Sequence, residues 1–361
     1  MSARLECSII NYMETIIRKV EKKQLDKESV RMAGEFLRQG GLVAFPTETV
    51  YGLGADALNE KAAEKIYAAK GRPSDNPLIV HITKMEELEA ITASVSREAV
   101  LVAKTYWPGP LTMIFEKSDK VPYGTTGGLD TVAVRMPSNE IARAVIEAGG
   151  GYIAAPSANT SGRPSPTTAH HVEEDLAGKI EMIVDGGAVD IGVESTILDM
   201  TVTPPMILRP GAVTKEMLED LIGEVAEDIT VIDPKSKVKP KAPGMKYRHY
   251  APKAELCIVE GAIDKVVSAI NAMAKEQTGK GYKVGIIGTK ETIDRYECGD
   301  VKSIGTREDE TTIATHLYGI LREFDKDKVD YIYSESFTAS GIGSAIMNRL
   351  SKAAGHYIIN V

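Results

Sequence analysis

The sequence predicts an α/β protein with two domains, a large open sheet followed by a smaller parallel sheet. A chain of 361 residues is long enough for two domains. Its first half contains short apolar runs without alternation, such as residues 42–45, which are typical of strands buried on both faces. Beyond residue 253, apolar strand patterns alternate regularly with helical ones, which indicates a parallel sheet.

Residues 1–232 are predicted to form the first of these domains. Two helices open it, residues 9–21 and 27–38, the second ending at Gly40 and Gly41. After strand 42–45 come a polar turn, Thr47 to Thr49, a helix over 59–70 with an apolar face, and strand 78–82. Further helices are expected at 84–90, 96–105, 141–147, 168–176 and 214–222, strands at 111–115, 131–136, 152–155, 182–185, 195–199 and 206–208, and a flexible loop at 124–128.

A change in composition separates this half from the rest. Residues 233–253 contain four prolines and seven Lys or Arg, with no acidic residue after Asp233, which predicts an extended linker. Residues 254–361 are then predicted to form the second domain, a small Rossmann-like parallel sheet. Its strands are expected at 256–259, 283–287, 301–304 and 331–334, and its helices at 264–275, 292–296, 311–324 and 343–354.

Charge and cysteine content limit the classes of function. The net charge of −8 argues against a protein that coats nucleic acid, although a local basic surface remains compatible with it. The three cysteines, Cys7, Cys257 and Cys298, are far apart, which argues against a disulfide framework or a structural zinc site. No apolar run has the pattern of a signal peptide or the length of a membrane span. We therefore expect a cytoplasmic protein without membrane association.

Four cations of the first half stand at strand ends or in loops, namely Lys70, Arg72, Arg135 and Arg209. A single Lys or Arg is usually a solvated surface charge. Arg135, however, lies inside an apolar strand, where an unpaired charge is costly. Arg72 and Arg209 are each followed by proline, which fixes the local backbone. Four such positions in an acidic protein favour an anionic ligand, either a polyphosphate or a carboxylate.

Hydroxyl-rich loops follow three of the predicted strands, around Thr47 and Thr49, from Ser157 to Ser165, and at Ser195. Loops are rich in such residues anyway, but three loops at the C-terminal ends of strands indicate one concave site. His81, taken alone, is better interpreted as a core histidine than as part of this site. No metal-binding spacing, P-loop or nucleophile elbow is present, and the GIG at 341–343 is weak support for a dinucleotide site.

Seven segments together resemble the threonylcarbamoyl-AMP synthase family, whose catalytic domain has a YrdC-like fold. They are PTETVYGLG, KGRPSDNPLIVHI, WPGPLTMIF, VAVRMPSN, APSANTSGRPSPT, VESTILD and ILRPGAV. The signature of that family appears here as Lys70 with Arg72 and Ser157 with Asn159. The basic linker and the trailing α/β domain resemble the longer, two-domain type of the family.

The resemblance implies a YrdC-like twisted open sheet with a concave ligand site and a specific reaction. L-threonine, bicarbonate and ATP give L-threonylcarbamoyladenylate and pyrophosphate, for the modification of adenosine beside the tRNA anticodon. It assigns L-threonine to Thr49, His81, Arg135 and Ser195, and ATP to Lys70, Arg72, Asn76, Thr131, Ser157, Asn159, Ser165, Arg209 and Tyr247. Lys70 and Arg72, with Mg²⁺ accompanying ATP, are the expected catalytic groups, and no metal-binding side chain is assigned.

Two further expectations concern the linker and the partners. The linker is predicted to act as a lid in which Tyr247, Arg248 and His249 close over the intermediate, the alternative being a basic spacer. The product is expected to pass to the tRNA threonylcarbamoyl-transfer machinery, without a requirement for direct tRNA contact. The alternative function is an RNA-binding module that uses the concave site and the basic linker, but the acidic total and a 6% aromatic content count against it.

Overall fold

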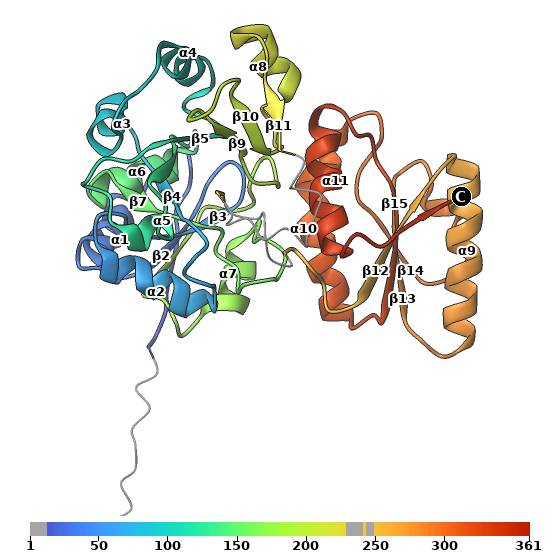
Figure 1. Ribbon diagram of the computed structural model, residues 1–361. Helices are drawn as coiled ribbons and strands as arrows, with labels where there is room; N and C mark the ends of the chain where they lie inside the picture. The colour runs from blue at the N-terminus through green and yellow to red at the C-terminus, as the bar shows by residue number, and fades with distance from the viewer. Residues whose placement is uncertain (1–12, 229–240, 243–248) are drawn as a thin grey trace, which may run out of the picture.

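The computed structural model describes residues 13–228, 241–242 and 249–361 (Figure 1). Most of the predicted linker, including Tyr247 and Arg248, therefore lies outside the described residues. Strands of the described chain form two sheets, one built from residues before 228 and one from residues after 254. No helix among the described residues has the length and apolar character needed to cross a membrane.

The first sheet has eleven strands in the order β1-β8-β2-β3-β7-β4-β6-β5-β9-β10-β11 and mixes parallel with antiparallel pairs. This confirms the predicted large open sheet. Its strands are β1 (Ile16–Lys19), β2 (Val43–Pro46), β3 (Tyr51–Asp56), β4 (Ile79–His81), β5 (Leu111–Glu116), β6 (Thr131–Arg135), β7 (Ile153–Ala154), β8 (Met182–Asp185), β9 (Thr196–Asp199), β10 (Met206–Arg209) and β11 (Ala226–Glu227). Around it lie α1 (Lys27–Arg38), α2 (Glu60–Lys70), α3 (Met85–Ile91), α4 (Arg97–Tyr106), α5 (Tyr123–Thr126), α6 (Glu140–Ala148), α7 (Ala169–Leu176) and α8 (Lys215–Ile222).

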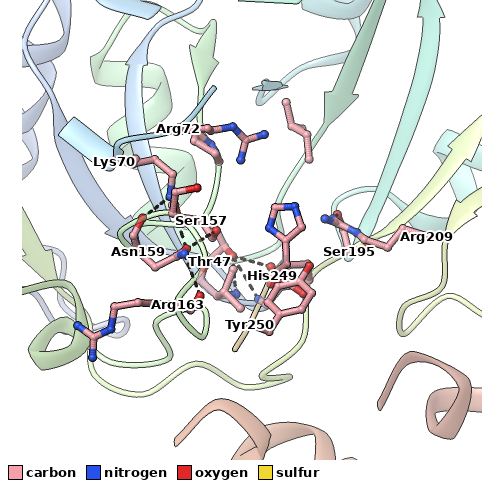
Figure 2. Close-up of a pocket in the computed structure, with 18 of the residues that line it drawn as sticks. Thr47, Lys70, Arg72, Ser157, Asn159, Arg163, Ser195, Arg209, His249 and Tyr250 are labelled. Carbon is pink, nitrogen blue, oxygen red and sulfur yellow. Dashed lines mark hydrogen bonds between the residues drawn. The ribbon is translucent and has the colours of Figure 1, made fainter. Parts of the chain in front are cut away.

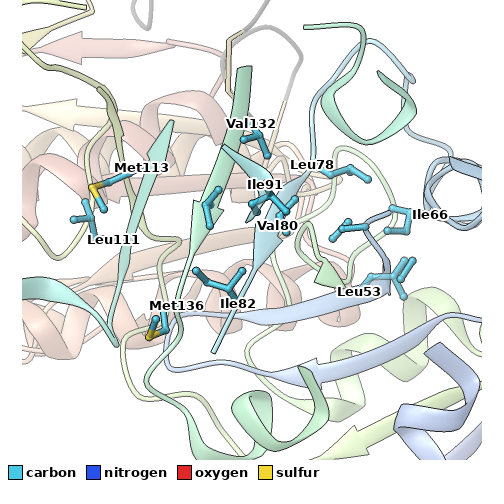
Figure 3. Packing of buried hydrophobic residues seen from close by; sticks show 14 of the residues in the cluster. Leu53, Ile66, Leu78, Val80, Ile82, Ile91, Leu111, Met113, Val132 and Met136 are labelled. Carbon is cyan, nitrogen blue, oxygen red and sulfur yellow. The ribbon is translucent and has the colours of Figure 1, made fainter. Parts of the chain in front are cut away.

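Local sequence signals explain why α2 forms where it does, and α2 carries Lys70 to the site. The Asn59 side chain accepts hydrogen bonds from the backbone N–H groups of Lys61 and Ala62, which caps the first turn. The helix ends at Gly71, whose φ of 63° is left-handed and suits glycine. Its apolar face joins a core that includes Leu53 and Val80 of the sheet and Leu78, which directly precedes β4 (Figure 3). Lys70 is thus the last helical residue on a firmly packed element.

Two of the predictions for the first half are wrong. Residues 16–19 are not helical, because they form the edge strand β1, which pairs in parallel with β8. Residues 9–12 of that predicted helix lie outside the described residues. The expected flexible loop at 124–128 contains the short helix α5, which ends at Gly127 with a φ of 64°.

A strand that the sequence did not predict, β3, pairs antiparallel with β2 to form a hairpin around the polar turn. Its glycines concealed the strand pattern. A Cβ atom on Gly54 would lie 2.6 Å from the Phe45 ring, so the close approach of the ring requires glycine there. The hairpin fixes the turn from Thr47 to Val50 at one edge of the concave site.

The second sheet has five strands, all parallel, in the order β14-β13-β15-β12-β16, which confirms the predicted parallel-sheet domain. It comprises β12 (Glu255–Glu260), β13 (Val284–Gly288), β14 (Asp300–Ser303), β15 (Tyr331–Glu335) and β16 (Ile358–Asn360), with α9 (Ile263–Gly279), the 3₁₀ turn η2 (Ile293–Arg295), α10 (Glu310–Asp327) and α11 (Gly341–Ala353). The sequence did not predict β16. Helices α10 and α11 lie between this sheet and the first domain, whereas α9 covers the opposite face (Figure 1).

Candidate active site

One cavity collects side chains from seven separate segments of the first domain and from the end of the linker (Figure 2). All four cations singled out in the sequence line it, although they come from α2, the loop after it, β6 and β10. The prediction that these four cations share one concave site is therefore confirmed. The cavity is lined by Thr47, Thr49, Val50, Gly52, Lys70, Arg72, Ile79, His81, Arg135, Ala155, Pro156, Ser157, Asn159, Ser161, Gly162, Arg163, Glu194, Ser195, Arg209, His249 and Tyr250.

Lys70 is buried and binds the loop that follows β7. Its Nζ donates hydrogen bonds to the backbone carbonyls of Ser157 and Asn159. The Ser157 hydroxyl in turn donates to Asn159 Oδ1 at 2.6 Å, and Asn159 Nδ2 donates to the carbonyls of Thr160 and Arg163 at 2.8 and 3.0 Å. Burial, with Arg72 nearby, holds the pKa of Lys70 well below its ordinary value. Three of the four signature residues thus form a single hydrogen-bonded network.

The Arg72 guanidinium is held by carbonyl groups alone in the part of the chain that the structure describes. Its Nη2 donates to the carbonyls of Pro77 at 3.1 Å and Asn76 at 3.4 Å, while its buried Nε has no described hydrogen-bond partner. Burial lowers its pKa to about 10. Neither Lys70 nor Arg72 lies within ion-pair distance of a described carboxylate. A buried ammonium and a half-buried guanidinium at this end of the cavity thus have no described acidic partner, and an anionic ligand would favour their charged forms.

Arg135 has a different environment. Its Nη2 forms an ion pair with Glu48 Oε1 at 2.7 Å, its Nη1 donates to Thr49 Oγ1 at 2.9 Å, and both charged side chains are buried. Sequence reasoning placed Glu48 in the polar turn without giving it a role. The ion pair fixes the direction of the guanidinium and neutralises its charge.

Ser195 and Arg209 meet on the opposite wall. Arg209 Nη2 donates to the Ser195 hydroxyl at 3.2 Å and its Nε donates to the Ser195 carbonyl at 3.1 Å. The Ser195 hydroxyl also lies 2.8 Å from the Thr112 hydroxyl of β5. Burial lowers the pKa of Arg209. A hydroxyl and a guanidinium are therefore presented to the cavity as one unit.

His81 lies on β4 beside Arg135, in the register that pairs these two residues. Its Nδ1 is 3.1 Å from the carbonyl of Ile79. Burial, together with the charge of Arg135, lowers its pKa to about 3, so the imidazole is neutral at neutral pH.

Three described residues assigned through the resemblance do not line the cavity, and all assigned binding roles stay predictions. Asn76 is buried and its carbonyl accepts from Arg72, while its Oδ1 lacks a described partner, and Thr131 opens β6. Ser165 is buried and donates to Glu194 Oε1 at 2.5 Å. Tyr247 lies outside the described residues. Conversely, the cavity includes Arg163, Glu194 and Tyr250, which sequence reasoning missed; Tyr250 directly follows His249 of the expected lid, and Glu194 directly precedes Ser195.

Comparison with known proteins agrees with this architecture. Two family models match, one described as "Telomere recombination" over residues 35–211 and one as "Threonylcarbamoyl-AMP synthase, C-terminal domain" over residues 213–355. Threonylcarbamoyl-AMP synthase of Pyrococcus abyssi is 51% identical over 340 residues, covering 94% of this chain and 98% of its own. The Bacillus subtilis synthase is 50% identical over 331 residues, covering 91% and 94%. This chain therefore belongs to the threonylcarbamoyl-AMP synthase family.

Solved structures give the same result. The crystal structure of P. abyssi Sua5 complexed with L-threonine superimposes with a TM-score of 0.91 at 50% identity and covers 96% of this chain and 100% of its own. A P. abyssi Sua5 variant in which a His and a Tyr are replaced by Ala matches with the same TM-score. The fold of both domains is thus that of the long, two-domain members.

Proposed function

We propose that this chain is an L-threonylcarbamoyladenylate synthase, a nucleotidyltransferase that uses L-threonine, bicarbonate and ATP. One observation carries the proposal. Lys70, Arg72, Arg135 and Arg209 converge with Ser195 on one cavity of a chain that is about half identical, over nearly its whole length, to synthases of that name. Its product would serve tRNA modification beside the anticodon.

The chemistry follows from the placement of charge. The threonine amine and bicarbonate condense to a carbamate with loss of water, and a carbamate oxygen attacks the α-phosphorus of ATP as pyrophosphate leaves. Negative charge grows on the phosphate oxygens, and the Lys70 and Arg72 cations stabilise it because they are already desolvated and oriented. No covalent enzyme intermediate is needed. Catalysis rests on positioning and electrostatic stabilisation.

Mg²⁺ is proposed to enter with ATP and to be held mainly by phosphate oxygens. Among the described residues, no group of three or more His, Cys, Asp or Glu side chains could hold a metal ion. The cavity carboxylate of Glu194 is already bound by Arg349, Tyr318 and Ser165. The bound ion would neutralise charge on the leaving pyrophosphate.

The linker is proposed to act as a lid over the intermediate, which is a mixed anhydride sensitive to water. His249 and Tyr250, at the end of the linker, line the cavity beside Arg209 and Glu194. Replacement of residues 233–248 by a Gly/Ser segment of the same length, which keeps the C-terminal domain and its contacts, separates the alternatives. A spacer leaves turnover and the lifetime of the adenylate unchanged, whereas loss of a lid shortens that lifetime.

Transfer of the product to a tRNA-modifying enzyme and a cytoplasmic location are further parts of the proposal. Both described cysteines, Cys257 and Cys298, are free thiols, which suits a reducing compartment.

Mass spectrometry of the product tests the proposed function. Full-length protein incubated with ATP, bicarbonate and L-threonine should yield threonylcarbamoyladenylate and pyrophosphate without RNA, and serine serves as the control substrate. Absence of the adenylate would overturn the proposal. The RNA-binding alternative instead predicts RNA affinity that falls steeply with salt concentration.

A further inference from the structure

A buried arginine of the C-terminal domain holds two loops of the catalytic cavity. Arg349 of α11 is fully buried, and its three nitrogens donate to the first domain. Nε bonds Glu194 Oε2 at 3.1 Å, Nη2 bonds the Glu194 carbonyl at 3.1 Å, and Nη1 bonds the Pro210 carbonyl. One guanidinium thus joins the segment that precedes β9 to the segment that follows β10, two strands that pair antiparallel in the first sheet.

Each of these segments carries a cavity residue at the adjacent position. Ser195 follows Glu194, and Arg209 precedes Pro210. The two segments are packed tightly against each other, because a Cβ atom on Gly211 would lie 2.3 Å from the backbone nitrogen of Thr196. The separation of the Ser195 hydroxyl from the Arg209 guanidinium is therefore set at the junction that Arg349 holds.

Tyr318 of α10 reinforces the same junction. Its hydroxyl lies 2.9 and 3.1 Å from the two carboxylate oxygens of Glu194, and its ring lies 5.2 Å from that of Tyr250, which lines the cavity. The second domain consequently supports three parts of the cavity wall from behind.

We infer that Arg349 is a positioning residue that acts through Glu194 and Pro210 to set the relative placement of Ser195 and Arg209. The inference rests on the proposed function, in which Ser195 contacts threonine and Arg209 contacts the nucleotide. Arg349 then fixes the spacing between the two substrates, so the C-terminal domain is a structural component of the substrate site. Arginine is required because its rigid fork satisfies a carboxylate and two carbonyls at once, which an ammonium on a flexible stem does not.

Arg349→Lys in the full-length protein is the decisive variant, since it keeps a positive charge against Glu194 and is therefore expected to fold. KM for threonine, KM for ATP and kcat of adenylate formation are measured together with the melting temperature. A misplacement on the scale of 1 Å lowers the rate by up to about a hundredfold, so we expect a raised KM for both substrates and a loss of kcat/KM approaching that size. Arg349→Met should show a larger loss if it folds.

Two control variants separate positioning from stability. Thr315→Val removes bonds of the same interface that reach only the carbonyls of Asp190 and Ile191. Ile270→Ala destabilises the distant core of the same domain. Both should retain wild-type KM values. Wild-type kinetics in Arg349→Lys would overturn the inference alone, whereas a wild-type protein that makes no adenylate would overturn the proposed function.

Discussion

The two ends of the cavity hold their cations in opposite ways. At the end assigned to ATP, Lys70 and Arg72 are bonded to carbonyl oxygens, and no described carboxylate lies within ion-pair distance. At the end assigned to threonine, Arg135 is neutralised by Glu48 at 2.7 Å. The first arrangement is unfavourable until an anion binds, and the second is complete without one.

The interface between the domains follows the second pattern. Arg322 of α10 pairs with Asp175 at 2.8 Å, and Arg349 pairs with Glu194 at 3.1 Å, with all four side chains buried. Paired buried charges therefore mark positions where the protein fixes its own geometry. Unpaired ones mark the place where a charged substrate supplies the partner.

The largest effect is expected from Lys70→Met and Arg72→Met. Each removes a desolvated cation from the phosphate end, and such groups in phosphoryl transfer are worth about 10³- to 10⁵-fold in rate. Because no described acid is left unpaired, the melting temperature should not fall as it does when an ion pair is broken. Pyrophosphate release and calorimetry measure the two quantities.

Lys65→Met is the matched control, since Lys65 lies on the same helix but donates to the carbonyl of Gly40 outside the cavity. If Lys70→Met keeps turnover within a few-fold of wild type, the cations at the ATP end have no special role, and the proposed difference between the two ends of the cavity is wrong.

The next largest effect is expected from breaking the buried ion pair between Arg135 and Glu48 at the threonine end. Arg135→Met leaves Glu48 buried without its cation and should reduce the free energy of unfolding by about 3–5 kcal/mol. The double variant Glu48→Gln with Arg135→Met should recover most of that loss. Urea unfolding of the three proteins gives the comparison. Equal free energies of unfolding for the single and double variants would mean that the unpaired charge of Glu48 does not cause the loss of stability.

The third prediction concerns acid. Burial alone would raise the pKa of Glu194, but Arg349, Arg209 and Ser165 lower it to about 2 from its ordinary 4.5. The unfolded state therefore binds this proton first as the pH falls. The resulting stabilisation, about 3 kcal/mol, is fully present above pH 4.5 and is lost between pH 4.5 and 2.

Urea unfolding of wild type and Glu194→Gln between pH 5 and 2.5 measures this contribution as the difference between the two curves. If the difference in free energy of unfolding between the two proteins is the same at every pH in this range, the Arg349–Glu194 pair does not favour the charged carboxylate.

Sequence reasoning located the cations and most of the helices because their signals are local. Asn59 and Gly71 mark the ends of α2, and the proline after Arg72 or Arg209 marks a fixed backbone. The partners of the cations were not predictable, because Glu48 and Arg135 are 87 positions apart and Glu194 and Arg349 are 155 apart. A local sequence pattern does not show which residues pair when they are so far apart in the sequence.

The errors have the same origin. Residues 16–19 form a strand only because β8, more than 160 positions later, supplies a parallel partner. β3 was missed because Gly52 and Gly54 weaken its pattern, although Gly54 serves the packing of Phe45. Ser165 shows that a residue assigned through resemblance can lie behind the cavity wall, where it holds Glu194.

The smallest expected effect is at His81. Its pKa of about 3 means that the threonine end carries a neutral imidazole beside a neutralised arginine, so this end should have little net charge at neutral pH. KM for threonine should accordingly change by less than about twofold between pH 5.5 and 7.5, where an ordinary histidine titrates. A step near pH 6.5 that disappears in His81→Asn would show a charged imidazole, and the contrast between the two ends of the cavity would then no longer hold.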